Sequence, residues 1–116
     1  MPAARKPELD SLFAALSDPT RRAIIERLLA KGELNVSEVA APFAISVPAI
    51  TRHLQVLERA GLITRRVERQ WRYVALRRGA LAPMEGWLSR ARQHWTGALD
   101  RLEMLAAEQM PKRRKS

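Results

Sequence analysis

The chain has 116 residues and no cysteine. It therefore forms no disulfide, no thiolate metal site and no cysteine nucleophile, and this composition fits a reducing compartment such as the cytoplasm. Histidine is also scarce, with two residues in the whole chain. Because a zinc site takes about four nitrogen, sulfur or oxygen ligands, we expect no metal site and no cofactor.

Long apolar runs and glycine-rich loops are lacking as well. No apolar stretch approaches the roughly 18 residues that a membrane-spanning helix needs, and residues 1–6 lack the apolar core of a signal peptide. The five glycines form no phosphate-binding fingerprint, and no Ser-His-acid arrangement is evident. We therefore expect a cytoplasmic protein that is not an enzyme.

Acidic residues are few relative to basic ones. The chain has 12 Asp and Glu against 21 Lys and Arg, which gives a formal charge of +9 and a pI near 11.4. A globular domain this basic usually meets a polyanion, most often nucleic acid or an anionic membrane surface. The hydrophobic fraction of 47% is enough for a core, although in a chain this short a partner chain often completes it.

Residues 8–110 are predicted to form one mainly helical domain between two short tails. Residues 1–7 are expected to be flexible. Residues 111–116 form a basic run that is either a disordered tail or an arm that touches phosphates. Apolar residues from 9 to 16 recur on one helical face. A second helix is expected between Asp18, as its N-cap, and Gly32, with Pro19 in its first turn.

The centre of the chain predicts a helix-turn-helix followed by a hairpin. Asn35 and Glu38 have the spacing of a capping box, which begins a short helix running roughly to Phe43. A second helix over about 46–60 starts at a serine N-cap and ends before a glycine. Two runs rich in β-branched and aromatic residues then predict a β-hairpin over about 62–76.

A second helix of this kind enters the DNA major groove with its N-terminal residues at base edges, and the hairpin after it forms a wing. Serine and threonine suit phosphates, arginine suits a phosphate or a guanine edge, and small apolar residues suit a thymine methyl group. The candidate DNA-binding residues are Ser46, Val47, Pro48, Ala49, Thr51, Arg52, His53 and Gln55 on the helix, with Arg65, Arg66, Arg69 and Arg72 on the wing.

The last segment, about 83–109, predicts a helix roughly 40 Å long. Its apolar residues alternate at intervals of four and three, as in a heptad repeat, and so long a seam suggests that a second chain covers part of it. Trp87 and Trp95 are expected in a dimer core, and a small-molecule pocket between helices is the alternative.

Four segments resemble the ArsR family of winged-helix repressors, in order and spacing. These are Leu16–Ile25, Val36–Ala40, Ile45–Leu57 and Ala60–Ile63. The resemblance covers about residues 9–76 and implies a winged helix-turn-helix, mainly α with a small β-hairpin wing, with long N- and C-terminal dimerisation helices. It also implies a homodimer that binds double-stranded DNA at a roughly palindromic operator and represses transcription.

The resemblance places the dimer interface on the first and last helices. The residues expected there are Leu9, Leu12, Phe13, Leu88, Ala91, Trp95, Leu99, Leu102 and Leu105. Metal-sensing members carry cysteine thiolates that this chain lacks, so it resembles a branch that does not sense metals. A small-molecule inducer is one candidate release signal, and a protein or autoregulation by concentration are the alternatives.

Individual residues leave alternatives open. His94 is expected at the surface or in the dimer interface, and His53 is either partly buried or in contact with a phosphate. The wing tip of the family often carries glycine where this chain has Arg69. Arg21 and Arg22 are expected on a solvated face or paired with Glu26 or Glu58, rather than on DNA.

Further alternatives concern the wing and the whole protein. The wing arginines could be plain surface charge, and Trp71 and Tyr73, on one strand face, favour packing over base stacking. The alternative function is a winged-helix protein-interaction module with only non-specific DNA affinity. A membrane-surface role ranks third, because the tryptophans of the last helix lie in the seam rather than acting as anchors.

Overall fold

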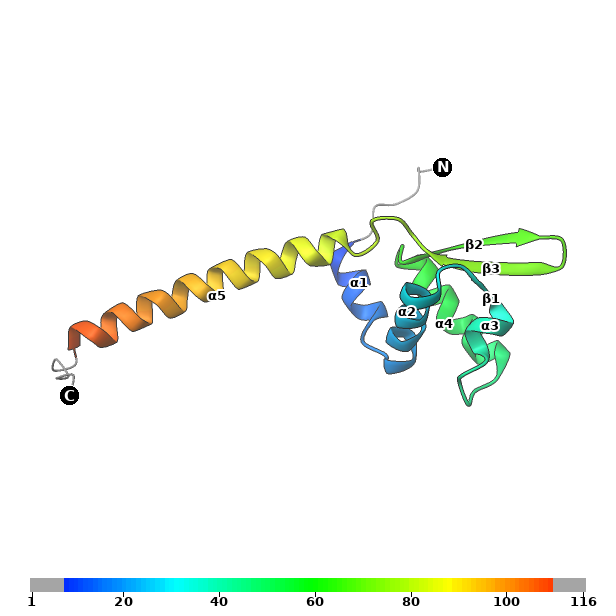
Figure 1. Ribbon diagram of the computed structural model, residues 1–116, viewed down its shortest axis with the longest axis horizontal. Coiled ribbons are helices and arrows are strands. Elements are labelled where there is room, and N and C mark those ends of the chain that lie inside the picture. The colour runs from blue at the N-terminus through cyan, green and yellow to red at the C-terminus, as the bar shows by residue number, and fades with distance from the viewer. Residues whose placement is uncertain (1–7, 110–116) are drawn as a thin grey trace. The chain divides into compact units, whose positions relative to one another are not determined.

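The computed structural model describes residues 8–109, and the chain divides into two compact units, 1–83 and 84–116. The expected tails at 1–7 and 111–116 lie outside the described residues. Figure 1 shows the elements in chain order. They are α1 (Leu9–Ala15), α2 (Pro19–Lys31), β1 (Leu34–Asn35), α3 (Val36–Ala40), α4 (Val47–Arg59), β2 (Ile63–Glu68), β3 (Trp71–Leu76) and α5 (Ala82–Gln109).

The ends of α2 are where the sequence predicts them. The Asp18 carboxylate accepts a hydrogen bond from the backbone N–H of Arg21 at 3.0 Å, so it satisfies one of the N–H groups that have no partner within the helix. Pro19 occupies the first turn. Gly32 ends the helix with a φ of +78°, a conformation that glycine adopts without steric cost.

The capping box of α3 is confirmed, but the helix is shorter than predicted. The Asn35 side chain accepts from the Glu38 N–H at 2.8 Å, and the Glu38 carboxylate accepts from the Asn35 N–H at 2.9 Å. The helix ends at Ala40 rather than near Phe43, because Pro42 has no N–H to donate to the Glu38 carbonyl. That carbonyl accepts instead from the Arg27 guanidinium, at 3.1 and 3.0 Å.

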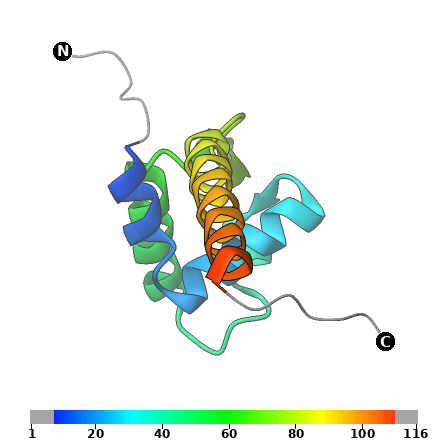
Figure 2. The ribbon, with the colours of Figure 1, turned by 90° about the vertical axis from the view of Figure 1, so that its left-hand side faces the viewer.

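Helix α4 begins at Ser46, whose hydroxyl accepts from the Ala49 N–H at 3.2 Å. One face of the helix is fully buried through Ile50, Leu54 and Leu57. On another side it lies beside α1, shown in blue in Figure 2, and side chains of both helices line a shallow cleft. The helix is therefore fixed by the core of the first unit. The other large, fully buried side chains of this core are Leu12, Ile24, Val39, Leu62 and Val74.

The wing is the predicted hairpin with an additional strand. Strands β2 and β3 are antiparallel, with Glu68 opposite Trp71 at the tip. Strand β1 pairs with β3 on its other edge, Leu34 opposite Val74, so the strand order is β1-β3-β2. The sequence analysis missed β1, because two residues show no periodicity and their strand character comes only from pairing with β3.

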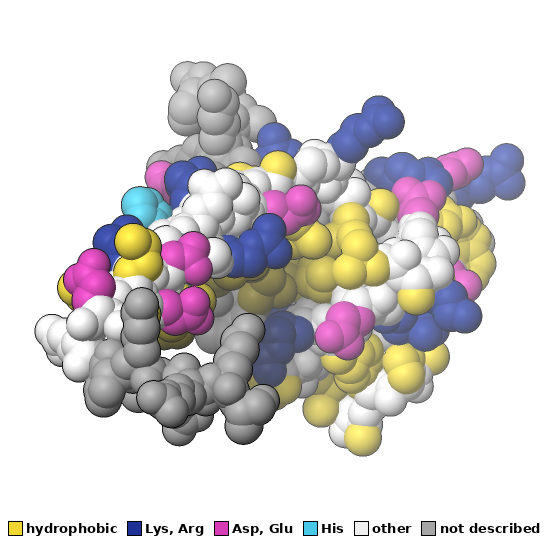
Figure 3. All heavy atoms as spheres, turned by 60° about the vertical axis from the view of Figure 1, so that its left-hand side comes forward, with side chains coloured by type: hydrophobic (Ala, Val, Ile, Leu, Met, Phe, Trp, Pro, Cys, Tyr) yellow, Lys and Arg dark blue, Asp and Glu magenta, His cyan; other side chains and the backbone are white. Residues whose placement is uncertain are grey.

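The described part of the second unit, residues 84–109, belongs to α5, a helix of 28 residues that buries none of them. Figure 3 shows yellow hydrophobic side chains among charged ones along its surface. Within residues 8–109, no helix combines the length and the apolar character needed to cross a bilayer.

Candidate nucleic-acid interface

The outward face of α4 carries the residues that the sequence predicts to read DNA. Their exposed members are Ser46, Val47, Pro48, Arg52 and Gln55, and the half-buried ones are Ala49, Thr51 and His53. This face is available because the opposite face of the helix is in the core.

Arg52 lies along this face. Its Nε donates to the Pro48 carbonyl at 3.4 Å, close to the limit for a hydrogen bond. No carboxylate of residues 8–109 forms an ion pair with it. Its guanidinium therefore keeps donors that can reach a phosphate or a base edge.

Arg66 in the wing is held by its own protein. Its guanidinium donates to both carboxylate oxygens of Glu33, at 3.0 and 2.7 Å, and to Glu68 at 2.6 Å. It also lies 4.4 Å from the centroid of the Tyr73 ring, within cation–π range. The hydrogen bonds from Arg66 lower the pKa of Glu33, and the bonds to Glu33 and Glu68 raise the pKa of Arg66. Arg66 thus ties β2 to the residue that precedes β1.

The other wing arginines differ in their partners. Arg65 donates to Glu58 of α4 at 3.2 Å, whereas Arg69 and Arg72 form no ion pair within the described part of the chain. Glu33 and Glu58 are not part of the hairpin in sequence, and only the folded chain brings these carboxylates to the wing.

Arg69 forms the tip of the wing in a strained conformation. It occupies the first position of a two-residue loop with a φ of +56°, the only positive φ of a non-glycine residue within residues 8–109. Gln70, the second residue of the loop, does not have a positive φ. A positive φ at the first position alone is the pattern of a type II′ turn, and that position favours glycine. The tip therefore adopts a glycine-type backbone although the residue is an arginine.

One groove is lined by residues from the start of α3, from α4 and from the wing. Its lining residues are Asn35, Val36, Ser37, Val47, Thr51, Arg65, Gln70, Trp71 and Arg72. Four of the predicted residues meet in this groove, which are Val47 and Thr51 of α4 and Arg65 and Arg72 of the wing. Asn35, Ser37, Gln70 and Trp71 belong to this surface although the sequence analysis did not assign them to it.

Comparisons with known proteins agree with this architecture. A family described as a helix-turn-helix domain matches residues 16–66. The transcriptional repressor SdpR of Bacillus subtilis is 35% identical over 69% of this chain and 88% of its own. The HTH-type transcriptional regulator Rv2034 of Mycobacterium tuberculosis is 42% identical over 78% of this chain and 80% of its own. The crystal structure of an ArsR family transcriptional regulator, RHA00566, superposes with a TM-score of 0.70 at 35% identity, over 76% of this chain and 96% of that one.

The chain belongs to the ArsR family. It is a winged helix-turn-helix transcriptional regulator and not an enzyme, as the sequence analysis expected.

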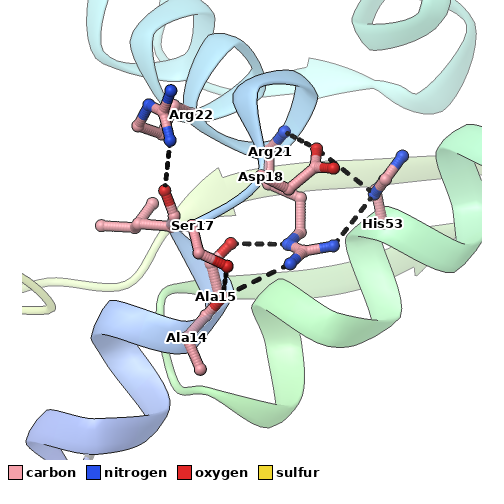
Figure 4. A network of polar contacts seen from close by, with 8 residues as sticks. Ala14, Ala15, Ser17, Asp18, Arg21, Arg22 and His53 are labelled. Carbon is pink, nitrogen blue, oxygen red and sulfur yellow. Dashed lines mark hydrogen bonds and ion pairs between the residues drawn. The ribbon is translucent and has the colours of Figure 1, made fainter.

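In this ArsR-family regulator, His53 of α4 is part of a polar network at the end of α1. Its Nδ1 lies 3.4 Å from a terminal nitrogen of Arg21 and 4.0 Å from Oδ2 of Asp18. The Arg21 side chain also donates to the carbonyls of Ala15 at 2.5 Å and Ala14 at 3.4 Å (Figure 4). The backbone N–H of Arg21 lowers the pKa of Asp18, the side chains of His53 and Arg21 act in the same direction, and desolvation opposes them.

This network corrects one of the two alternatives expected for Arg21 and Arg22, their pairing with a glutamate, whereas Arg22 is exposed as the other alternative predicts. Neither residue pairs with Glu26 or Glu58. Arg22 donates to the Leu16 carbonyl at 2.8 Å, and Arg21 bonds to backbone carbonyls and a histidine. Carbonyls near the end of a helix have no partner within the helix, and two arginines of the next helix satisfy them here.

The residues expected in a dimer interface fall into two groups. On α5, Leu88, Trp95 and Leu102 are exposed at intervals of seven residues, and Leu99 and Leu105 are exposed beside them; Ala91 is half-buried. On α1, Phe13 is 38% exposed and Leu9 is half-buried. Leu12 differs, because its side chain is fully buried in the core of the first unit and has no surface left for a partner.

The described part of the chain holds no cluster of three or more His, Asp or Glu residues that could bind a metal ion. His94, one of the two histidines, is exposed on α5.

Proposed function

We propose that this regulator is a homodimeric, cytoplasmic repressor that binds a palindromic operator, with α4 in the major groove and the wing on the adjacent DNA backbone. The observation that carries this proposal is the shared surface of α4, the N-terminus of α3 and the wing. Because one rigid core supports all three elements, their donors approach DNA together.

Helix α4 supplies the base contacts in this proposal. Arg52 is exposed, is free of ion pairs within residues 8–109, and has the fork of donors that recognises guanine or phosphate. Val47 is 51% exposed at the N-terminal end of the helix, where an apolar side chain can contact a thymine methyl group. Ser46 and Thr51 present hydroxyls that suit phosphates.

The wing supplies backbone contacts, chiefly from Arg69 and Arg72. Both are exposed, and a phosphate does not have to displace a carboxylate to reach them. Arg65 and Arg66 give up protein ion pairs on contacting DNA, so we expect a smaller net contribution from them. Their main role in this proposal is to hold the wing in place.

The homodimer is proposed from the exposed apolar seam of α5. Trp95 and Leu102 are 66% and 61% exposed, and large apolar residues at heptad spacing on a long helix favour packing against another helix. Phe13 and Leu9 of α1 remain candidates for the interface, and Leu12 is withdrawn from it.

The runner-up is a winged-helix protein-interaction module. Two exposed apolar side chains of the wing favour this alternative. Val67 is 71% exposed and Trp71 is 45% exposed, and exposed aromatic side chains such as Trp71 often contact protein. This module would bind DNA without regard to sequence.

Selection of bound fragments from a random DNA library tests the proposal and distinguishes it from this alternative. A dimer with one α4 helix in each half-site should enrich an inverted repeat whose half-site centres are separated by about 10–10.5 base pairs or a multiple of that. Enrichment of a single asymmetric site would contradict the symmetric dimer. A library that stays random would contradict sequence-specific binding and favour the protein-interaction module.

A further inference from the structure

The side chain of Arg21 connects three helices at one point. Its Nε and one terminal nitrogen donate to carbonyls of α1, those of Ala15 and Ala14, and the other terminal nitrogen lies 3.4 Å from His53 Nδ1 on α4 (Figure 4). Arg21 itself lies on α2 and is half-buried. All three guanidinium nitrogens therefore already face acceptors within the protein.

The contact with His53 favours one of the two positions that the imidazole proton can take. A guanidinium has only donors, and a neutral imidazole has one donor nitrogen and one acceptor nitrogen. A hydrogen bond across this 3.4 Å contact requires Nδ1 to be the acceptor, which places the proton on Nε2. The Asp18 carboxylate would favour the opposite arrangement, but it is 4.0 Å from Nδ1 and already accepts the backbone N–H of Arg21 at 3.0 Å.

The other ring nitrogen of His53 is free to face outward. In Figure 4 it points away from Arg21 and Asp18, and the side chain is 23% exposed. His53 directly follows Arg52 on α4, the helix that carries the proposed DNA-reading face. An N–H at this position would be a donor toward DNA, whereas an unprotonated nitrogen would be an acceptor that repels phosphate oxygens.

We propose that Arg21 is a positioning residue for DNA binding, which keeps the proton of His53 on Nε2 so that this N–H donates to a DNA phosphate. The inference rests on the proposed function. It gives Arg21 a role without contact to DNA, because its nitrogens are directed into the protein. It also selects phosphate contact for His53 from the two alternatives that the sequence leaves open.

The first test measures the proton on His53 in the free protein. Long-range ¹H–¹⁵N NMR of the imidazole, at alkaline pH so that the ring is neutral, distinguishes a protonated from an unprotonated ring nitrogen. We expect Nε2–H in the wild type and in Arg22→Met, and a mixture of the two tautomers in Arg21→Met. Arg22 is a matched control, because it lies next to Arg21, carries the same charge and donates to the carbonyl of Leu16 at 2.8 Å. A wild-type ring with its proton on Nδ1 would overturn the proposal.

The second test measures operator binding by the same variants. Arg21→Met should weaken binding by the inverse of the Nε2–H fraction that remains, which for an even mixture is about twofold per subunit and about fourfold for a dimer, and should leave the dependence on salt unchanged. Arg22→Met should bind like the wild type. In a His53→Ala background, Arg21→Met should have no further effect on affinity.

Three results of the second test would overturn the proposal. The first is equal affinity for the two methionine variants, and the second is additivity of Arg21→Met with His53→Ala. The third is a salt slope flattened by about 1.8 in Arg21→Met, one phosphate from each subunit of the dimer, which would make Arg21 a direct phosphate contact. If Arg21→Met does not fold, as judged by circular dichroism, the wild-type NMR spectrum still tests the position of the proton. The phosphate contact of His53 is then tested by two variants. His53→Ala should bind about tenfold more weakly, and His53→Gln, with one acceptor and one donor group, should recover part of the loss.

Failure of the inference differs from failure of the proposed function. If the wild type prefers no DNA sequence, the proposed function falls, and the phosphate contact of His53 falls with it. The NMR experiment needs no DNA and still reports whether Arg21 fixes the proton.

Discussion

Replacing Arg69 at the tip of the wing should change the stability of the protein and its affinity for DNA in opposite directions. Arg69 has a φ of +56°, and a positive φ costs an L-residue about 1–2 kcal/mol. Glycine removes this strain but loses about 0.5–1 kcal/mol through the greater freedom of the unfolded chain. At the midpoints of these ranges, Arg69→Gly should therefore stabilise the fold by about 0.75 kcal/mol, which raises Tm by about 3–6 °C.

The same substitution should weaken DNA binding, because the wing loses its cation. Each neutralised phosphate contributes about 0.9 to the slope of log K against log salt concentration. One contact from each wing of a dimer should therefore flatten the slope by about 1.8 in Arg69→Gly. The assay combines thermal unfolding by circular dichroism with anisotropy titrations of operator DNA at several salt concentrations.

Two control variants assign these effects to their causes. Arg69→Ala removes the cation but keeps the strain, so it should lose the same slope without the rise in Tm. Arg69→Lys keeps both the charge and the strain, so it should resemble the wild type in both assays. An unchanged salt slope in Arg69→Gly would refute the contact between the wing tip and DNA, and an unchanged or lower Tm would refute the strain.

The remaining predictions concern the reading helix, the seam of α5 and the cap of α2. Arg52→Ala should cost about 1–3 kcal/mol of binding free energy and relax specificity at one base position; an equal loss on all sequences, measured by titration of operator variants, would make Arg52 a phosphate contact. Leu102→Asp places an unpaired charge in the apolar seam and should weaken the dimer about tenfold or more; an unaltered dimer in sedimentation would show that the seam is not the interface. The folded protein lowers the pKa of the Asp18 carboxyl group. The ionised carboxylate therefore stabilises the fold at pH values above its ordinary pKa of about 3.9. This contribution is lost as the pH falls through the lower pKa of the folded protein. The Tm advantage of the wild type over Asp18→Asn should thus shrink as the pH falls below about 4, and a constant difference would contradict the assignment.

The helices of the first unit could be predicted because local signals mark their ends. Asp18, Asn35 and Ser46 each cap a helix as their sequence context indicates, and Gly32 and Gly61 adopt positive φ where α2 and α4 end. Such signals involve residues three or four positions apart, so the order of residues is sufficient to read them.

The features that were missed depend on contacts between distant segments. Strand β1 exists because it pairs with β3, and Glu33 reaches Arg66, 33 positions later in the chain. The acceptors of Arg21 are backbone carbonyls of α1, and no pattern of side-chain charge reveals a carbonyl. Leu12 shares the apolar face of its helix with Phe13, and only the packed structure shows that Leu12 is in the core.

The sequence predicts the DNA-contacting residues as a set and does not rank them individually. The sequence places four arginines on the wing. In the structure, Arg65 and Arg66 are paired with carboxylates. Within residues 8–109, Arg69 and Arg72 form no ion pair. This difference comes from the approach of α4 and the β1 edge to the wing, which the local sequence does not encode.

The central claim is sequence-specific DNA binding by the surface of α4 and the wing. The most direct measurement is an anisotropy titration of the wild type against the DNA just upstream of its own gene, with a scrambled duplex as control, at two salt concentrations. The account predicts that the upstream DNA is bound about 10³-fold more tightly than the scrambled duplex, and that this preference persists at the higher salt concentration. Equal, weak binding to both duplexes that vanishes with salt would contradict it.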